Sequence, residues 1–205
     1  MSLPTPFNFS EHLFALNRGR AAKIAYLDDH GALTYGQLED RARRFAAALK
    51  AAGIEREERV LLLQLDSIDW PVSFLGCLYA GVVPVAVNTL LTADDYAYML
   101  EHSGSVAALV SGALLPVLQD AMSRAPHALR QLFVSHPVTP LQDGAQSFDS
   151  MIAEHAPMSE HWQRNRPITP SGSIPPARPG DPRARCMRTA AFGGPQNSSA
   201  SRCSR

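Results

Sequence analysis

The order of apolar and polar positions divides the chain near residue 160. Before that point, short apolar runs alternate with longer stretches in which apolar residues recur every three or four positions. The first pattern is typical of β-strands and the second of amphipathic helices. The pattern then stops, and Arg and Pro dominate the sequence to its end. We therefore predict one ordered part over residues 1–160 and a different kind of polymer over residues 161–205.

Strands and helices alternate in the predicted ordered part. The run Val60-Leu61-Leu62-Leu63 suits a strand that is buried on both faces, as in a parallel sheet. Parallel neighbours need crossover connections, and these cover the two faces of the sheet. The expected fold class is α/β, with a mostly parallel sheet and helices on both faces. The predicted strands are 22–27, 59–65, 82–87, 106–110 and 132–134, and the helices are 9–16, 35–52, 68–80, 92–102, 113–122 and 148–155.

Several predicted helices begin at recognisable capping residues. Thr34 and Gln37 have the spacing of a capping box, in which each side chain bonds the other residue's backbone N–H. Thr92 is expected to open a later helix in the same way, with acidic residues in the first turn. Ser67 is predicted to cap the helix between them, which has Pro71 in its first turn.

Few residues of the ordered part suggest chemistry. Asp66 and Asp69 flank a helix start, where capping is favoured over general acid/base work. Lys23 and Lys50 lie outside apolar settings that would lower an amine pKa, so neither is proposed as a catalytic amine. Trp70 is predicted to be a core residue. No phosphate-binding Gly-rich loop is recognisable in residues 1–160, since Gly76 and Gly81 lack the required spacing.

Metal and disulfide sites are not predicted either. Three histidines on helical segments lack a partner four residues away and are interpreted as solvated or capping groups: His12, His102 and His155. Cys77, Cys186 and Cys203 have neither metal-site spacing nor a disulfide framework, so we expect reduced thiols. No apolar run is long enough to span a bilayer, and no signal peptide is recognisable. We expect a cytoplasmic protein without membrane contact.

The charge changes sign at the same place as the apolar pattern. Residues 1–160 contain 2 Lys and 9 Arg against 18 Asp and Glu, whereas residues 161–205 contain 8 Arg and one acid, Asp181. The neutral total therefore hides an acidic first part and a basic tail. A basic tail is compatible with nucleic-acid binding, but it lacks interleaved aromatic residues and a scaffold. Disorder over 161–205 is the favoured interpretation, and no nucleic-acid partner is predicted.

Two segments carry a resemblance to a known family. They are residues 65–71, Leu-Asp-Ser-Ile-Asp-Trp-Pro, and residues 81–92, Gly-Val-Val-Pro-Val-Ala-Val-Asn-Thr-Leu-Leu-Thr. These segments closely resemble benzoate-CoA ligases, a branch of the adenylate-forming acyl-CoA synthetases. The resemblance continues more loosely from about residue 8 to residue 155. It implies that residues 1–160 are a partial N-terminal subdomain of such an enzyme.

The resemblance also implies a reaction for the intact family. A carboxylate and ATP give an acyl-adenylate and pyrophosphate, and coenzyme A then displaces AMP to form a thioester; Mg²⁺ accompanies the ATP. The family's phosphate loop, aromatic-acid pocket and catalytic lysine cannot be placed on this sequence. We therefore predict no catalytic, cofactor-binding or metal-binding residue in this chain. ATP, Mg²⁺, coenzyme A and the aromatic carboxylate are expected as ligands of the full-length enzyme only.

The tail contains a hidden match to the family in another reading frame. Permitted codons for residues 174–189, read two bases later, spell Ser-Ser-Gly-Ser-Thr-Gly-Arg-Pro-Lys-Gly-Thr-Val-His-Ala-His, which resembles the family's phosphate loop. Met187 and Cys186 offer little codon freedom and still yield the expected histidine. The segment Ser171-Gly172-Ser173 is interpreted as a coincidence, since Pro175 and Pro176 follow it. The sequence therefore predicts an out-of-frame tail.

Three hypotheses remain at this point. The leading one is a truncated benzoate-CoA ligase fragment without adenylation activity. The second is a non-enzymatic binding module that uses its basic tail. The third is a fragment that regains function by association with a separately made remainder of the ligase. The aromatic acid, the oligomeric state and the origin of the frame change are not readable from the sequence.

Overall fold

The structure is a computed structural model that describes residues 7–29, 31–141 and 144–162. Its strands are β1 (Ile24–Asp28), β2 (Gly31–Thr34), β3 (Arg59–Leu63), β4 (Val83–Ala86), β5 (Ala107–Ser111), β6 (Gln131–Ser135) and β7 (Ala145–Ser147). Its α-helices are α1 (Phe9–Asn17), α2 (Tyr35–Ala51), α3 (Asp69–Ala80), α4 (Ala93–Ser103), α5 (Leu115–Arg124) and α6 (Phe148–Glu154). Short 3₁₀ turns follow α1 (Arg18–Arg20) and precede α5 (Gly112–Leu114).

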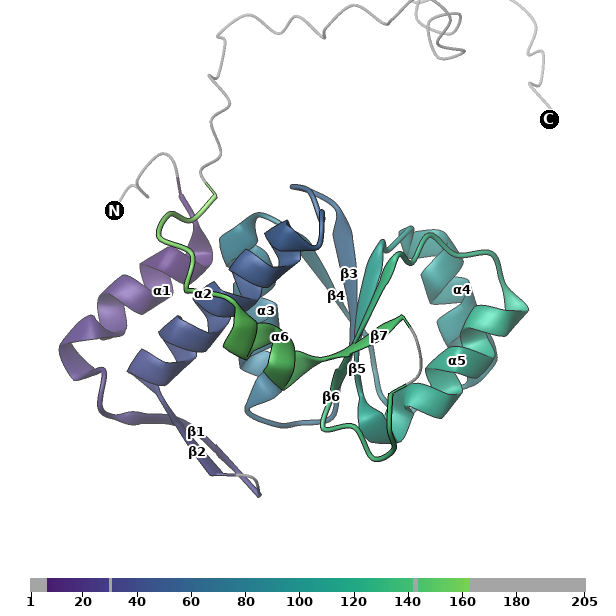
Figure 1. Cartoon of the computed structure of the whole chain (residues 1–205), viewed down its shortest axis with the longest axis horizontal. Helices are drawn as coiled ribbons and strands as arrows, with labels where there is room; N and C mark the ends of the chain where they lie inside the picture. Colours follow the sequence, from purple (N-terminus) through teal and green to yellow (C-terminus); the bar gives the residue numbers. More distant parts are fainter. Residues whose placement is uncertain (1–6, 30, 142–143, 163–205) are drawn as a thin grey trace, which may run out of the picture. The chain divides into compact units, whose positions relative to one another are not determined.

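The central sheet has the strand order β4-β3-β5-β6-β7, and each of these neighbouring strands pairs in parallel. Helices α1, α2, α3 and α6 lie on one side of it, and α4 and α5 lie on the other (Figure 1). The prediction of an α/β fold with a mostly parallel sheet covered on both faces is confirmed.

Successive residues of the inner strands serve two separate cores. Val60 and Leu62 belong to the core beneath α2 and α3, whereas Leu61 and Leu63 belong to the core beneath α4 and α5. All four side chains are fully buried. This alternation follows from the two-residue period of a strand. It explains why the four residues Val60–Leu63 are all apolar, as predicted.

Helices α2 and α3 cross closely because Gly76 has no side chain. A Cβ atom at Gly76 would lie 2.7 Å from Cδ1 of Phe45 and 2.8 Å from the carbonyl oxygen of Ala42. Both neighbours are buried residues of α2. Gly76, which lacks the spacing of a phosphate-binding loop, therefore allows close helix packing.

The predicted caps of α2 and α4 are confirmed, and the predicted cap of α3 is wrong. Thr34 with Gln37, and Thr92 with Asp95, form reciprocal capping boxes. Helix α3 has Ile68 at its N-cap position and no side-chain cap. The backbone N–H of Ile68 donates instead to Oδ2 of Asp28, over 2.8 Å. A residue from the β1–β2 hairpin thus takes the role that the sequence suggested for Ser67.

We expect the Thr92→Ala substitution to lower the free energy of unfolding by about 1 kcal/mol, because α4 loses its side-chain cap.

The hydrogen bonds from the Thr92 hydroxyl and backbone lower the pKa of Asp95. A lowered pKa in the folded state stabilises the fold above the ordinary carboxyl pKa, and this contribution is lost as the pH falls through the lowered value. The stability difference between the unaltered chain and Asp95→Asn should therefore shrink from pH 7 to about pH 3. Urea unfolding at both pH values measures it, and an unchanged difference would contradict this account.

Strands β2 and β7 were not predicted. β2 pairs antiparallel with β1 to form a separate two-stranded sheet, and β7 adds a three-residue parallel edge strand next to β6. Both are short, and the stretch after Asp28 reads as a turn in the sequence. The signal of β2 is weak because Gly31 and Thr34 bracket only two apolar residues.

Residues 155–162 pack against α2 and α3. Nε of Arg43 donates to the carbonyl oxygen of Met158 over 2.8 Å, and Nη1 of Arg44 donates to that of His155 over 2.9 Å. The backbone N–H of Trp162 donates to the carbonyl oxygen of Tyr79 over 3.0 Å. Packed residues therefore continue two positions beyond the predicted boundary at residue 160. The predicted tail lies, apart from its first two residues, outside the described part of the chain.

Two further properties follow from the described residues. No helix among them combines the length and apolar content needed to cross a membrane. Cys77 is fully buried in α3, and burial raises the pKa of its thiol. Cys186 and Cys203 lie outside the described residues.

Candidate functional site

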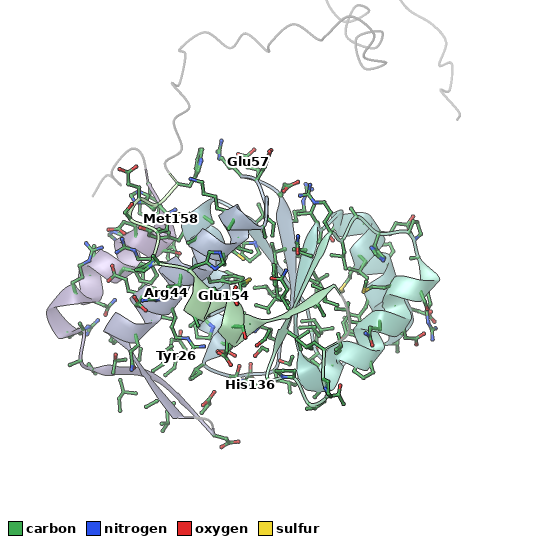
Figure 2. The ribbon with its side chains drawn as sticks, viewed as in Figure 1. Tyr26, Arg44, Glu57, His136, Glu154 and Met158 are labelled. Atoms are coloured by element: carbon green, nitrogen blue, oxygen red, sulfur yellow. The ribbon has the colours of Figure 1, made fainter. Side chains whose placement is uncertain are left out.

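The carboxyl edge of the parallel sheet is the first place to look for a site. The chain passes from β3 to β4 on one side of β3 and then crosses to β5 on its other side. Open α/β sheets bind ligands outside the carboxyl ends of their strands at such a change of direction. His136, just after β6, lies on the lower side of the view, and Glu57, just before β3, lies on the upper side (Figure 2). The carboxyl edge therefore faces downward in this view.

A buried carboxylate lies at this edge. Asp69, the first residue of α3, is 1% exposed. Its Oδ1 atom lies 2.7 Å from Nη2 of Arg41 in α2, and its Oδ2 accepts a 2.6 Å hydrogen bond from the Ser135 hydroxyl at the end of β6. Ser73 donates to the Asp69 carbonyl oxygen over 2.6 Å. One carboxylate thus joins α2, α3 and β6.

A histidine and a second aspartate border this cluster. Nε2 of His136 lies 3.2 Å from Oδ2 of Asp69, and His136 has a positive φ of 48°. Asp149 in α6 lies 3.2 Å from the same Arg41 nitrogen that holds Asp69, but its side chain is 62% exposed. The arginine therefore serves a buried and an exposed carboxylate together.

The geometry suits a structural role better than catalysis. A nucleophilic serine needs a neighbouring base that is free to accept its proton. The carboxylate next to Ser135 already accepts a 2.7 Å hydrogen bond from the Arg41 guanidinium. The arrangement fixes the relative positions of three elements at the carboxyl edge, and we assign it no proton transfer.

Gln64 lies one residue after β3, at the change of strand direction. It is 3% exposed, and neither its Oε1 nor its Nε2 has a hydrogen-bond partner among the described residues. The adjacent N–H of Leu65 donates to the hydroxyl of Ser111, at the end of β5, over 3.0 Å. A neutral amide can orient a polar group but does not act as an acid or base at ordinary pH.

The acidic residues at the start of α3 do not have their predicted role. Asp66 and Asp69 do not cap the helix, since α3 has no side-chain cap. Asp69 is committed to Arg41 and Ser135 because the helix start is buried against α2 and β6. Trp70 is only partly buried and stacks on Phe74 with ring centroids 5.1 Å apart, so its assignment to the core is wrong. It borders the hairpin rather than the sheet.

The other residues considered from the sequence are not brought together. Lys23, just before β1, and Lys50, in α2, are both exposed. His102 is exposed and stacks on Tyr98, His12 contacts Phe7, and Nδ1 of His155 lies 2.8 Å from the Met151 carbonyl oxygen at the end of α6. Within the described ranges, no group of three His, Cys, Asp or Glu residues could hold a metal ion.

The Asp69 cluster was missed because its members are far apart in the sequence. Arg41, Asp69 and Ser135 come from three elements, and only the fold places them in contact. One signal was available. An aspartate followed by Trp-Pro-Val at a helix start is surrounded by apolar residues, and a carboxylate in such surroundings needs a cation.

Known proteins resemble this chain over most of its described part. Residues 14–182 match the family model described as AMP-binding enzyme. A benzoate–CoA ligase of Thauera aromatica is 38% identical over 80% of this chain and 30% of its own length. A solved benzoate CoA ligase from Burkholderia xenovorans is 51% identical, with a TM-score of 0.68, over 76% of this chain and 30% of its own. A solved anthranilate CoA ligase in complex with anthranoyl-AMP is 30% identical, with a TM-score of 0.73, over 78% of this chain and 30% of its own.

These matches leave most of each relative uncovered. The chain spans about 30% of the length of the Thauera ligase and of both solved ligases. The family match extends past the predicted boundary at residue 160 and ends at residue 182, within the tail. It covers well over half of the sequence, and the chain therefore belongs to the AMP-binding enzyme family.

Proposed function

We propose that the chain is the N-terminal part of an ATP-dependent benzoate–CoA ligase, which forms benzoyl-AMP and then benzoyl-CoA. The observation that carries this proposal is the 51% identity to a solved benzoate CoA ligase over 76% of the chain. The match to the Thauera benzoate–CoA ligase agrees with it. Benzoate is favoured over hydroxybenzoates and anthranilate by these identities, although a 4-hydroxybenzoate–CoA/benzoate–CoA ligase of Rhodopseudomonas palustris is also 43% identical over 53% of the chain.

The described residues do not fit an ATP site. Triphosphate binding needs several backbone N–H groups in a glycine-rich loop and a free cation. At the carboxyl edge, the N-terminus of α3 carries Asp69, and Asp66 lies close by in sequence, so an anion would meet negative charge there. The cation at this place, Arg41, is bound by Asp69 and Asp149. We therefore derive no reaction step within this part of the chain.

On this proposal the chain by itself is inactive and serves as the scaffold subdomain of the ligase. The displaced-frame match over residues 174–189 supports the idea that the phosphate loop is encoded but not translated in register. ATP, Mg²⁺, coenzyme A and the aromatic acid are then ligands of the full-length enzyme. A cytoplasmic location remains a prediction. The alternative of a nucleic-acid-binding module rests on residues outside the described part, and the similarity to CoA ligases does not favour it.

Benzoate-dependent pyrophosphate release by the purified chain tests the proposal. We expect a rate indistinguishable from that of a sample without benzoate, because no group on the described part neutralises the triphosphate. An intact benzoate–CoA ligase assayed in parallel shows that the assay works. Turnover by the chain within about tenfold of the intact enzyme would contradict the assignment as an inactive scaffold.

The nucleotide sequence provides a separate test of the frame change. We expect the coding DNA for residues 155–205 to contain, in the displaced frame, the Ser-Ser-Gly-Ser-Thr-Gly run, followed by a reading frame of ligase length. Resequencing of that region is sufficient to check this. Codons that do not yield the run would leave the family assignment intact and overturn the out-of-frame tail.

A further inference from the structure

The β1–β2 hairpin is set apart from the central sheet. It extends away from α2 as a separate two-stranded ribbon (Figure 1). Among the described residues, β1 and β2 pair only with each other, and no other described strand lies at the second edge of either. An isolated pair of strands is marginally stable in water, and an open edge is a template for another strand.

The hairpin also exposes apolar side chains. Ile24, Tyr26 and Leu27, all in β1, are 55%, 46% and 76% exposed. Tyr26 lies on the same side of the molecule as His136 and the carboxyl edge (Figure 2). Scattered exposed apolar residues are ordinary, but three within four positions of a free strand form a patch.

A hollow of about 270 Å³ adjoins β1. Tyr26, Leu27 and Asp28 line it from the hairpin, and Ser67, Trp70 and Pro71 are among its lining residues from the start of α3. The hydroxyl oxygen of Ser67 is buried and has no hydrogen-bond partner among the described residues. The hollow thus combines apolar side chains with Ser67 and two acidic residues, Asp28 and Asp66, beside β1.

We propose that the free edge of β1, together with this hollow, binds an extended strand from the remaining part of the ligase. Strand addition of this kind gains affinity from main-chain hydrogen bonds and specificity from side-chain pockets. The inference rests on the proposed function, because it takes the occupant from the other 70% of the relatives' length. It adds to that function the surface through which this part recognises the remainder.

Charge argues against other occupants. The described residues 23–34 contain one cation, Lys23, and two acids, Asp28 and Asp29. A nucleic acid or an anionic membrane would be repelled rather than attracted by this balance. A second copy of the chain, paired through β1, is the remaining competitor, and the experiment below separates it.

The test is co-expression of the full 205-residue chain, carrying an affinity tag, with an untagged segment of the Burkholderia xenovorans benzoate CoA ligase that follows the matched region. We expect the two to purify together. Leu27→Asp should reduce the amount of partner recovered about tenfold or more. The reason is that residue 27, exposed in the chain alone, would be buried in the complex, so the substitution would bury a charge there. Leu16→Asp is the matched control, because Leu16 is 65% exposed and belongs to α1 rather than to the hairpin, and we expect recovery within about twofold.

A second readout does not depend on the substitutions. Amide hydrogen exchange over residues 24–28 should be fast in the chain alone and at least about tenfold slower in the complex. Equal recovery with Leu27→Asp and Leu16→Asp would overturn the inference, as would no recovery with the unaltered chain. Self-association of the chain that Leu27→Asp abolishes would assign the edge to a second copy and also overturn it. The pyrophosphate assay on the complex is independent: a complex that forms without activity refutes the proposed ligase function and leaves the strand site standing.

Discussion

We expect the Arg41→Met variant to lose about 3 kcal/mol of unfolding free energy, because Asp69 would remain as a buried carboxylate without its cation. Removal of one partner of a buried ion pair typically costs about 3–5 kcal/mol. The lower end applies here because the Arg41 side chain is 25% exposed and the Ser135 hydroxyl still donates to Asp69. Urea unfolding of the purified variant at pH 7 measures the loss.

Two further variants separate the buried pair from the exposed one. Asp149→Asn removes the exposed partner of Arg41 and should cost at most about 0.5 kcal/mol. The double variant Arg41→Met with Asp69→Asn should be more stable than Arg41→Met alone, since no uncompensated charge is left. If the double variant loses the sum of the two single effects, Asp69 does not depend on Arg41 and the account fails.

Gly76→Ala should destabilise the chain by about 3 kcal/mol through overpacking of the α2–α3 crossing. The added methyl group would meet the ring of Phe45 and the backbone carbonyl of Ala42, and a helix backbone cannot move without disturbing its neighbours. Helix propensity alone predicts the opposite sign, because alanine is the better helix former. Thermal or urea unfolding therefore decides between packing and propensity at one position.

Gly19→Ala is the matched control for this substitution. Gly19 lies in the short 3₁₀ turn after α1, and nothing lies within 4 Å of the position that a Cβ would take. We expect a change within about 0.5 kcal/mol. A Gly76→Ala variant as stable as Gly19→Ala would show that α2 and α3 have room to separate.

The sequence was sufficient for the elements whose signals are local. The capping boxes at Thr34 and Thr92 depend on residues three apart, and the apolar run of β3 depends on adjacent residues, so each could be recognised within one short window. The cap of α3 could not. Its N–H bonds to Asp28, forty positions earlier, and only the docked hairpin brings the two together.

The same difference between local signals and distant contacts explains why the site was harder to predict than the fold. The chemistry of Asp69 is decided by Arg41 and Ser135, which lie on other elements, and the neighbouring Trp-Pro dipeptide only indicated that the position is apolar. Trp70 was predicted to be a core residue from its place in the first turn of a helix, but it borders the open hollow beside β1. Contacts between distant segments are what a single sequence does not display.

Because Val60–Leu63 are all aliphatic, burial of apolar side chains does little to specify the register of β3 against its neighbours. If the strand slid by one position, Leu61 would exchange layers with Leu62, and the run Val60–Leu63 would still supply aliphatic side chains to both layers. Backbone hydrogen bonds at the start of the strand join it to both neighbours: the carbonyl oxygen of Glu58 accepts from the N–H of Val83, and that of Arg59 accepts from the N–H of Val106. Exchanges among Val, Ile and Leu within β3 should therefore change the stability of the chain little. A one-residue deletion in the turn before β3 would instead disrupt these hydrogen bonds to both neighbouring strands.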